Sequence, residues 1–203
     1  MAIVALAEDD LRLREVCAPL SRRDLHLKRQ QAEIDELLDF VYGKVNKRVP
    51  GSVRDRSRPG TVGLSANQVG IMKQICVVDL SIGRRGYYDL HVLVNPRIVW
   101  RSKTSVERIE SCVNFTTIWG KTRRSQTVKV EAWDRSGNEI SLKLTGWSAA
   151  LLQHEIDHLN GRLFIDRLVD PTHADLVKAN EYPAYRKTKD DWPNKTDVSG
   201  RVR

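Results

Sequence analysis

The chain has 203 residues, of which 40% are hydrophobic and 30% charged, and its formal net charge is +8. This composition is typical of one folded globular domain and argues against a disordered chain. No segment has the ~20 consecutive apolar residues of a membrane-spanning helix, and no basic residue precedes the apolar run at the N-terminus, so we expect a cytoplasmic protein with no membrane partner.

The first half of the chain predicts two helices followed by strands. Apolar residues recur at helical spacing over residues 10–20 and 31–45, whereas residues 47–60 are rich in Arg, Ser, Pro and Gly and predict a loop. Strands are expected at residues 74–80, 91–99, 126–132 and 139–144. Ser136-Gly137-Asn138 predicts a hairpin turn between the last two.

A buried helix is expected over residues 148–159, because its residues are largely apolar and Gly161 is a typical C-terminal stop. Beyond Pro171 the sequence predicts a short helical piece and then a loose polar tail, since residues 181–203 are polar and contain two prolines. We therefore predict a catalytic domain over residues 1–170 and a C-terminal extension over residues 171–203.

The segment His154-Glu155-Ile156-Asp157-His158 is the most informative motif. Two histidines four residues apart lie on one face of a helix, where both rings can bind one metal ion. Glu155, between them, is placed to act as a general base on water without being a ligand. The motif predicts a metal-dependent hydrolase.

A catalytic metal site usually has three protein ligands and one position open to water. The candidates downstream of the motif are Asp166, Asp170, His173, Asp175 and Glu181. Upstream, Cys112 could supply a thiolate from a segment that we expect to be irregular and to lie between strands. The residues alone leave these alternatives open. Cys17 and Cys76 are interpreted as core residues of a protein from a reducing compartment.

The sequence resembles the peptide deformylase family in three motifs that occur in the family's order. They are Gly63-Leu64-Ser65-Ala66-Asn67-Gln68, then Glu110-Ser111-Cys112-Val113-Asn114, then Gln153-His154-Glu155-Ile156-Asp157-His158-Leu159. The resemblance extends over about residues 8–170. It implies an α+β fold in which antiparallel sheets form a cradle around a central helix carrying the HExxH motif.

The resemblance also implies an activity and a set of site residues. The activity is removal of the N-formyl group from the N-terminal methionine of new polypeptides, with release of formate. Cys112, His154 and His158 would bind one divalent ion, expected to be Fe²⁺ in the cell, although Zn²⁺, Ni²⁺ or Co²⁺ fits the same ligands. Glu155 would move the protons.

Further roles follow from the resemblance and from helical spacing. The Gln68 amide and the Val113 backbone N–H would donate to the developing oxyanion. The N-formylated peptide would lie as an added strand beside Gly63, Leu64 and Ser111. Helix positions one and two turns before His154 would line its side-chain pocket. These are Trp147, Ala150 and Leu151.

Several residues near the motifs depart from the family's usual pattern. They are Thr61, Ser65, Ser111, Val113, Asn114 and Trp147. An added side chain where Gly is usual can restrict the approach of a ligand to the backbone. Two alternatives therefore remain: a divergent deformylase acting on a specialised N-formylated peptide or metabolite, and a catalytically silent homologue that binds peptide or ribosome.

Basic residues occur in scattered clusters rather than in one tail. Arg54, Arg56 and Arg58 form one cluster, and Lys121, Arg123 and Arg124 form another. A basic surface favours polyanionic partners, and the ribosome is the partner that the resemblance suggests. The sequence contains no motif for specific DNA recognition.

Overall fold

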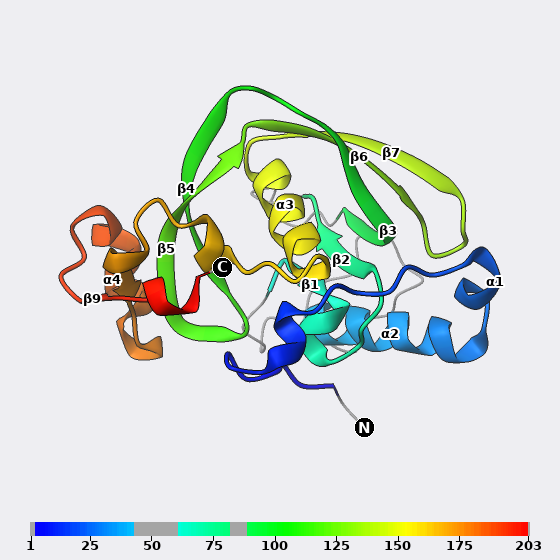
Figure 1. The fold of residues 1–203 in the computed structure, drawn as a ribbon, viewed down its shortest axis with the longest axis horizontal. Helices are drawn as coiled ribbons and strands as arrows, with labels where there is room; N and C mark the ends of the chain where they lie inside the picture. The colour runs from blue at the N-terminus through cyan, green and yellow to red at the C-terminus, as the bar shows by residue number, and fades with distance from the viewer. Residues whose placement is uncertain (1–2, 43–60, 82–88, 203) are drawn as a thin grey trace.

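The computed structural model describes residues 3–42, 61–81 and 89–202 of the chain. It confirms the α+β class, with two antiparallel sheets and few helices (Figure 1). The α-helices are α1 (Arg22–Leu25), α2 (Lys28–Tyr42), α3 (Trp147–Leu159) and α4 (Tyr182–Thr188). The strands are β1 (Gly63–Ser65), β2 (Ile75–Asp79), β3 (Leu90–Arg101), β4 (Ser105–Cys112), β5 (Phe115–Ser125), β6 (Thr127–Trp133), β7 (Glu139–Thr145), β8 (Ala174–Leu176) and β9 (Lys195–Thr196).

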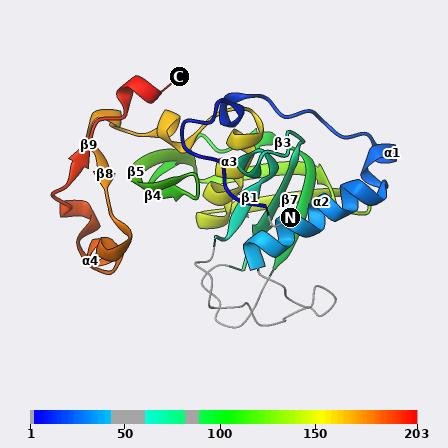
Figure 2. The same ribbon diagram turned by 90° about the horizontal axis from the view of Figure 1, so that it is seen from below.

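The first sheet has the order β1-β2-β3-β6-β7 and packs against helices on both faces. Strand β2 shows why, because all its residues are buried. Four of them are apolar, and the fifth, Asp79, accepts hydrogen bonds from Ser81. Cys76 and Val78 point to the cluster that includes α3, whereas Ile75 and Val77 point to the cluster that includes α2. This alternation follows from the two-residue period of a strand. Figure 2 shows α2 running along the outer side of this sheet.

Helix α3 contacts strands of both sheets and lies between them (Figure 1). Residues 149–159 are all buried, although five of them are polar or charged. Burying such side chains is unfavourable unless each has a partner, so the polar face of α3 must be matched by groups from the surrounding strands. That requirement shapes the site described below.

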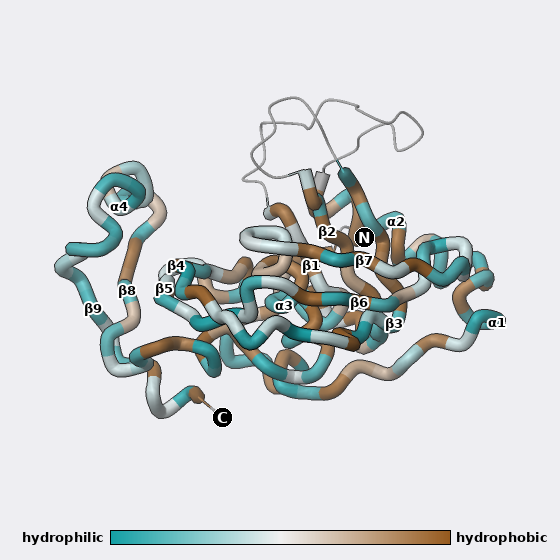
Figure 3. The backbone as a smooth tube through the Cα atoms, turned by 90° about the horizontal axis from the view of Figure 1, so that it is seen from above, coloured by the Kyte–Doolittle hydropathy of each residue, from teal (hydrophilic) through white to brown (hydrophobic). Residues whose placement is uncertain are grey.

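The second sheet has the order β4-β5-β8-β9, and its last two strands come from the C-terminal extension. The prediction of a loose tail needs a correction here. Most of the extension is hydrophilic (Figure 3), but Val177, Tyr185 and Trp192 form a buried cluster against Ile109 and Trp119. Three apolar side chains therefore attach a polar segment to the domain. The domain division at residue 170 stays a prediction.

The N-terminal helix expected over residues 10–20 is also corrected. The structure has only a short 3-10 helix at Leu11–Arg14, and the chain then runs extended. Val16 bridges to Asn160, and Ala18 bridges to Lys73. Pro19 disfavours a helical Ala18, because its ring clashes with the backbone of the preceding residue. Tertiary pairing replaces the helix that the apolar spacing predicted.

The other predicted elements are confirmed with shifts of a few residues at their ends. Helix α2 begins three residues before its prediction, and α3 and the four predicted strands lie where expected. The predicted loop over residues 47–60, including Arg54, Arg56 and Arg58, lies outside the described residues. Among the helices that are described, none is long and apolar enough to cross a membrane.

Gly161 ends α3 in a way that another residue cannot. Its φ is +67°, and a Cβ there would lie 2.3 Å from the main-chain oxygen of Arg14. We expect Gly161→Ala to lower the free energy of unfolding by about 1–3 kcal/mol, because it adds left-handed strain and a backbone clash. Gly200→Ala is the control, since no atom lies within 4 Å of a Cβ at that position. Equal stability of the two variants in urea unfolding would contradict the expectation.

Candidate metal centre and its buried ion pairs

Cys112, His154 and His158 converge on one point between β4 and α3. Their potential ligand atoms all lie within 4.8 Å of one another, and all three residues are buried. Cys112 Sγ lies 3.3 Å from His158 Nε2, which lies 3.1 Å from His154 Nε2. Among the residues that the structure describes, this is the one cluster of His, Cys, Asp and Glu suited to a metal ion.

Local structure explains the convergence. The two histidines are four residues apart on α3 and so share one helical face. The irregular segment predicted at Cys112 is confirmed in part: Cys112 is the last residue of β4, the strand register is irregular between Ser111 and Cys112, and Val113-Asn114 is a tight turn into β5. The end of a paired strand holds its side chain more firmly than a loop does.

Glu110 orients His154 from the same strand as Cys112. Its Oε2 lies 2.9 Å from His154 Nδ1, which leaves Nε2 directed toward the cluster. The Arg124 guanidinium holds Glu110 through two hydrogen bonds of 2.8 and 2.9 Å. Burial alone would raise the pKa of Glu110, but Arg124 and His154 outweigh it and hold that pKa far below its ordinary value.

Arg124 also bonds Asp157 of α3, which Arg167 holds through bonds of 3.0 and 2.8 Å. The expectation that Arg124 belongs to an exposed basic cluster is therefore wrong, because the residue is only 3% exposed. Lys121 and Arg123 beside it are exposed. The alternation along β5 sends every second side chain inward, and that side includes Arg124.

The chemistry of the cluster fits a divalent ion. His158 Nε2 faces Cys112 and His154, and burial lowers the pKa of this imidazole well below its ordinary value. A neutral imidazole is the form that binds a metal. Burial lowers the pKa of His154, but its contacts with Cys112 and Glu110 raise it well above the ordinary value. A bound cation would replace that proton among the same donors.

Glu155 lies against β1, where two residues shape its position. Ser65 Oγ lies 2.7 Å from Glu155 Oε2 and 2.8 Å from the main-chain oxygen of Glu155. A Cβ on Gly63 would lie 2.5 Å from Glu155 Oε1, so only glycine permits this approach. Burial raises the pKa of Glu155 above its ordinary value, as suits a group that must accept and return a proton.

Gln68 reaches the cluster from the 3-10 helix that follows β1. Its Nε2 lies 3.2 Å from Cys112 Sγ and 3.0 Å from Asn114 Oδ1, while its Oε1 accepts a hydrogen bond of 2.7 Å from the Ser65 N–H. One amide N–H is thus directed at the place where the three candidate ligands meet. Gln68 is buried, so this orientation is held by protein groups.

The structure places the other predicted site residues around this centre. Gly63 and Leu64 lie in β1, Ser111 precedes Cys112 in β4, and Val113 follows it in the turn. The Leu64 side chain is buried in the cluster on the α2 side. Ala150 and Leu151 are buried, whereas Trp147, at the start of α3, is 41% exposed.

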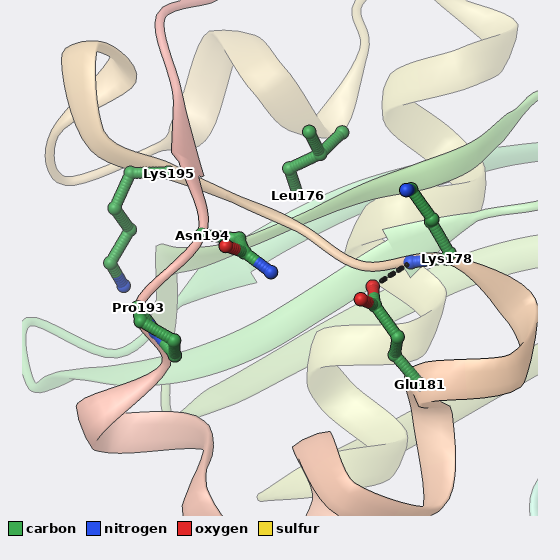
Figure 4. A pocket seen from close by; sticks show the side chains of 6 residues that line it. All are labelled: Leu176, Lys178, Glu181, Pro193, Asn194 and Lys195. Carbon is green, nitrogen blue, oxygen red and sulfur yellow. Dashed lines mark hydrogen bonds between the residues drawn. The ribbon is translucent and has the colours of Figure 1, made fainter.

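A separate cavity of about 370 Å³ lies in the C-terminal extension (Figure 4). Its lining residues are Leu176, Lys178, Glu181, Pro193, Asn194 and Lys195. Glu181, one of the downstream candidate ligands, lines it, whereas Cys112, His154, Glu155 and His158 do not. Glu181 binds the main chain of Lys178 at its edge, so part of its polar lining is already paired within the segment.

Sequence reasoning assigned no individual role to four residues that contact the centre: Glu110, Arg124, Ser65 and Asn114. A signal was available for Glu110, because residues two apart in a strand share a face and Glu110 is two residues before Cys112. The partners of the other three come from elsewhere in the fold. Cys17 and Cys76 are buried in the core as predicted, and burial raises the pKa of the Cys17 thiol to about 12.

Comparison with known proteins gives a consistent result. Residues 1–174 match the family model described as Polypeptide deformylase. A peptide deformylase of Teredinibacter turnerae is 34% identical over 82% of this chain and 87% of its own length. Peptide deformylase 1B, chloroplastic, of Solanum lycopersicum is 35% identical over 68% of this chain, which spans 43% of that relative. A solved peptide deformylase from Synechococcus elongatus in complex with actinonin has a TM-score of 0.68 and 27% identity, covering 99% of this chain and 90% of that one.

The buried pairing of Arg124 with Glu110 and Asp157 makes a sharp prediction. Arg124→Leu removes the arginine partner of Glu110 and one of the two arginine partners of Asp157, and we expect a loss of roughly 3–5 kcal/mol in the free energy of unfolding. We also expect metal affinity to fall about 10–100-fold, because Glu110 then no longer holds His154. Urea unfolding and metal titration measure the two effects.

Arg123→Leu is the matched control, because Arg123 is the neighbouring residue and its ion pair with Glu107 is exposed. Little change is expected there. The folded state lowers the pKa of Glu110 and Asp157 from ordinary values of 4.5 and 3.8, so their stabilisation is complete above those values and lost as pH falls through the folded pKa values. If Arg124→Leu unfolded like the control, the buried pairs would not have the role assigned to them.

Proposed function

The chain belongs to the polypeptide deformylase family and is a hydrolase that removes the N-formyl group from new polypeptides; we propose that Cys112, His154 and His158 hold its metal and that Glu155 moves its protons. The convergence of one sulfur and two imidazoles within 4.8 Å is the observation that carries the proposal. Family members are metal-dependent, and these donors suit a divalent ion.

When bound, the metal supplies Lewis acidity, which polarises an oxygen and brings the pKa of water toward neutrality. The residues around it prepare that site. Glu110 fixes the orientation of His154, and Arg124 keeps Glu110 ionised. A histidine ligand whose other ring nitrogen is held in this way loses little freedom when the ion binds.

Glu155 is proposed to act as general base and then general acid. Its carboxylate lies beside the cluster on α3, where Ser65 Oγ bonds one oxygen and the absence of a side chain on Gly63 leaves space for the other. Because burial raises its pKa, the carboxylate can take a proton from water at neutral pH and return it to the departing amine. Formate and a free amino group are the products.

Gln68 and Val113 are proposed to stabilise the oxyanion that develops on the formyl group. The Gln68 amide directs an N–H at the cluster, and Val113 begins the turn directly after Cys112. Two donors on opposite sides of a carbonyl oxygen are the arrangement that such intermediates require. Removing one of them typically lowers kcat by about 10²–10³-fold.

The substrate is proposed to bind as an added strand beside β1. Sheet order places β1 at an edge, paired only with β2 among the described strands, so Gly63 and Leu64 can offer main-chain groups to a peptide. Ser111 would be the partner on the facing strand. Ala150, Leu151 and Trp147 are proposed to line the pocket for the first side chain, with Trp147 at its exposed side.

Three further assignments stay predictions: ferrous iron as the native ion, with Zn²⁺, Ni²⁺ or Co²⁺ as substitutes; the cytoplasm as the location; and the ribosome as a partner. Among the described residues, Lys121 and Arg123 are exposed. They provide part of the basic surface that binding to ribosomal RNA would need.

The role of Glu155 is tested by Glu155→Ala. We expect the variant to bind metal as the wild type does and to lose turnover by about 10²–10⁴-fold, because the proton carrier is gone while all three ligands remain. Metal analysis of anaerobically prepared protein and formate release from formyl-Met-Ala-Ser measure the two properties. Cys112→Ala is the companion variant and should lose the metal itself. Near-normal rates in metal-loaded Glu155→Ala would refute the proton-transfer role.

One observation favours a second candidate, a deformylase with a specialised substrate. The Thr61 hydroxyl donates a hydrogen bond of 2.6 Å to the Gly63 carbonyl, a group that an added peptide strand would use. We expect formyl-methionine peptides to be the best substrates if the enzyme serves nascent chains in general. A panel of formyl-Met peptides, other formyl peptides and formylated small amines decides by kcat/KM. Formyl-Met peptides as the poorest substrates would favour the specialised enzyme.

A further inference from the structure

Asn114 makes more contacts with the catalytic amide than its place in a turn requires. It is the second residue of the Val113-Asn114 turn, it is buried, and its side chain has partners at both ends. Its Nδ2 donates to the main-chain oxygens of Leu6 and Gln68, at 2.9 and 3.0 Å. Its Oδ1 accepts from Gln68 Nε2 at 3.0 Å.

These contacts leave only one orientation for each amide. The two main-chain oxygens can only accept, so the nitrogen of Asn114 must face them and its oxygen must face Gln68. Gln68 must therefore present its nitrogen to Asn114. The Ser65 N–H independently requires the Gln68 oxygen on the opposite side, at 2.7 Å. Both ends of the Gln68 amide are thus determined by fixed groups.

The consequence concerns the second hydrogen of the Gln68 nitrogen. An amide nitrogen has two hydrogens in one plane, and Asn114 occupies one of them. The other is directed at the cluster, where Cys112 Sγ lies 3.2 Å from the nitrogen. Without Asn114, rotation about the last side-chain bonds of Gln68 would let this donor leave the position where the oxyanion develops.

We propose that Asn114 is a positioning residue for the reaction, which holds the Gln68 amide so that one N–H meets the developing oxyanion. The inference rests on the proposed function, because it assumes that Gln68 is an oxyanion donor. Asn114 itself need not touch the substrate. An alternative role confined to stability would arise from its bonds to Leu6 and to the main chain of Gln68.

A double-mutant cycle separates positioning from stability. Four proteins are compared: wild type, Asn114→Ala, Gln68→Ala and the double variant. We expect Asn114→Ala to lower kcat for formyl-Met-Ala-Ser by about ten-fold or more, with KM and metal content little changed, because misplacing a catalytic donor mainly affects the transition state. In the Gln68→Ala background the same substitution should change kcat by less than about two-fold, because residues that act as a unit are not additive.

Two further variants keep the test decisive. Gln31→Ala is the stability control, since Gln31 on α2 likewise donates to two main-chain oxygens, those of Leu25 and Arg135, but contacts no residue of the site. It should lower the melting temperature and leave kcat unchanged. If Asn114→Ala does not fold, Asn114→Leu takes its place in the same cycle, because leucine has a similar size and no polar atom to bond Gln68.

Each result has one meaning. A loss of kcat that depends on Gln68 supports the proposal. The proposal is overturned if Asn114→Ala lowers kcat equally in the wild-type and Gln68→Ala backgrounds. It is also overturned if the wild-type enzyme is active and Asn114→Ala does not lower its kcat. Absence of formate release from metal-loaded wild-type protein would instead contradict the proposed function, so the two failures are distinguishable.

Discussion

The site depends on the buried guanidinium of Arg124, which joins the second sheet to α3. It binds Glu110 of β4 and Asp157 of α3, so one buried cation links two carboxylates, of which Asp157 is also paired with Arg167. Through Glu110 it sets the ring of His154, and through Asp157 it fixes the helix that carries both histidines. Removing such a partner is strongly unfavourable, whereas the intact pairs specify one relative position of strand and helix. The candidate metal ligands come from those same two elements.

A second constraint is the close approach of α3 to β1. Gly63 provides the space, because a Cβ would strike both Glu155 and Leu151. Ser65, two residues later on the same strand, then bonds the Glu155 carboxylate. A base that must exchange protons with water and substrate works best when its carboxylate does not have to reorganise. One short strand therefore supplies both the space and the hydrogen bond that hold the base.

The strongly periodic elements, and the residues that converge as candidate metal ligands, could be predicted from the sequence. The helical face of His154 and His158 follows from spacing alone, while the choice of Cys112 as third candidate required the likeness to a family. Strands β4 and β5 were missed because their inward positions include Glu110 and Arg124, which hide the apolar alternation that identifies a strand. The helix expected after Asp10 failed because its residues pair with segments remote in sequence, and local periodicity contains no information about those partners.

Ser65 and Asn114, two of the residues that depart from the family pattern, both contact groups that we propose to be catalytic. Ser65 Oγ donates to the Glu155 carboxylate, and Asn114 Oδ1 accepts from Gln68 Nε2. The main-chain N–H of Ser65 donates to the Gln68 oxygen, so positions 65 and 114 hold the two sides of that amide. A buried polar network is stabilising only when all its members are paired. Removing the Ser65 hydroxyl would leave one oxygen of the Glu155 carboxylate without its partner. Removing the Asn114 side chain would leave one hydrogen of Gln68 Nε2 without its acceptor. Both side chains of this sequence therefore hold groups that we propose to take part in the same reaction.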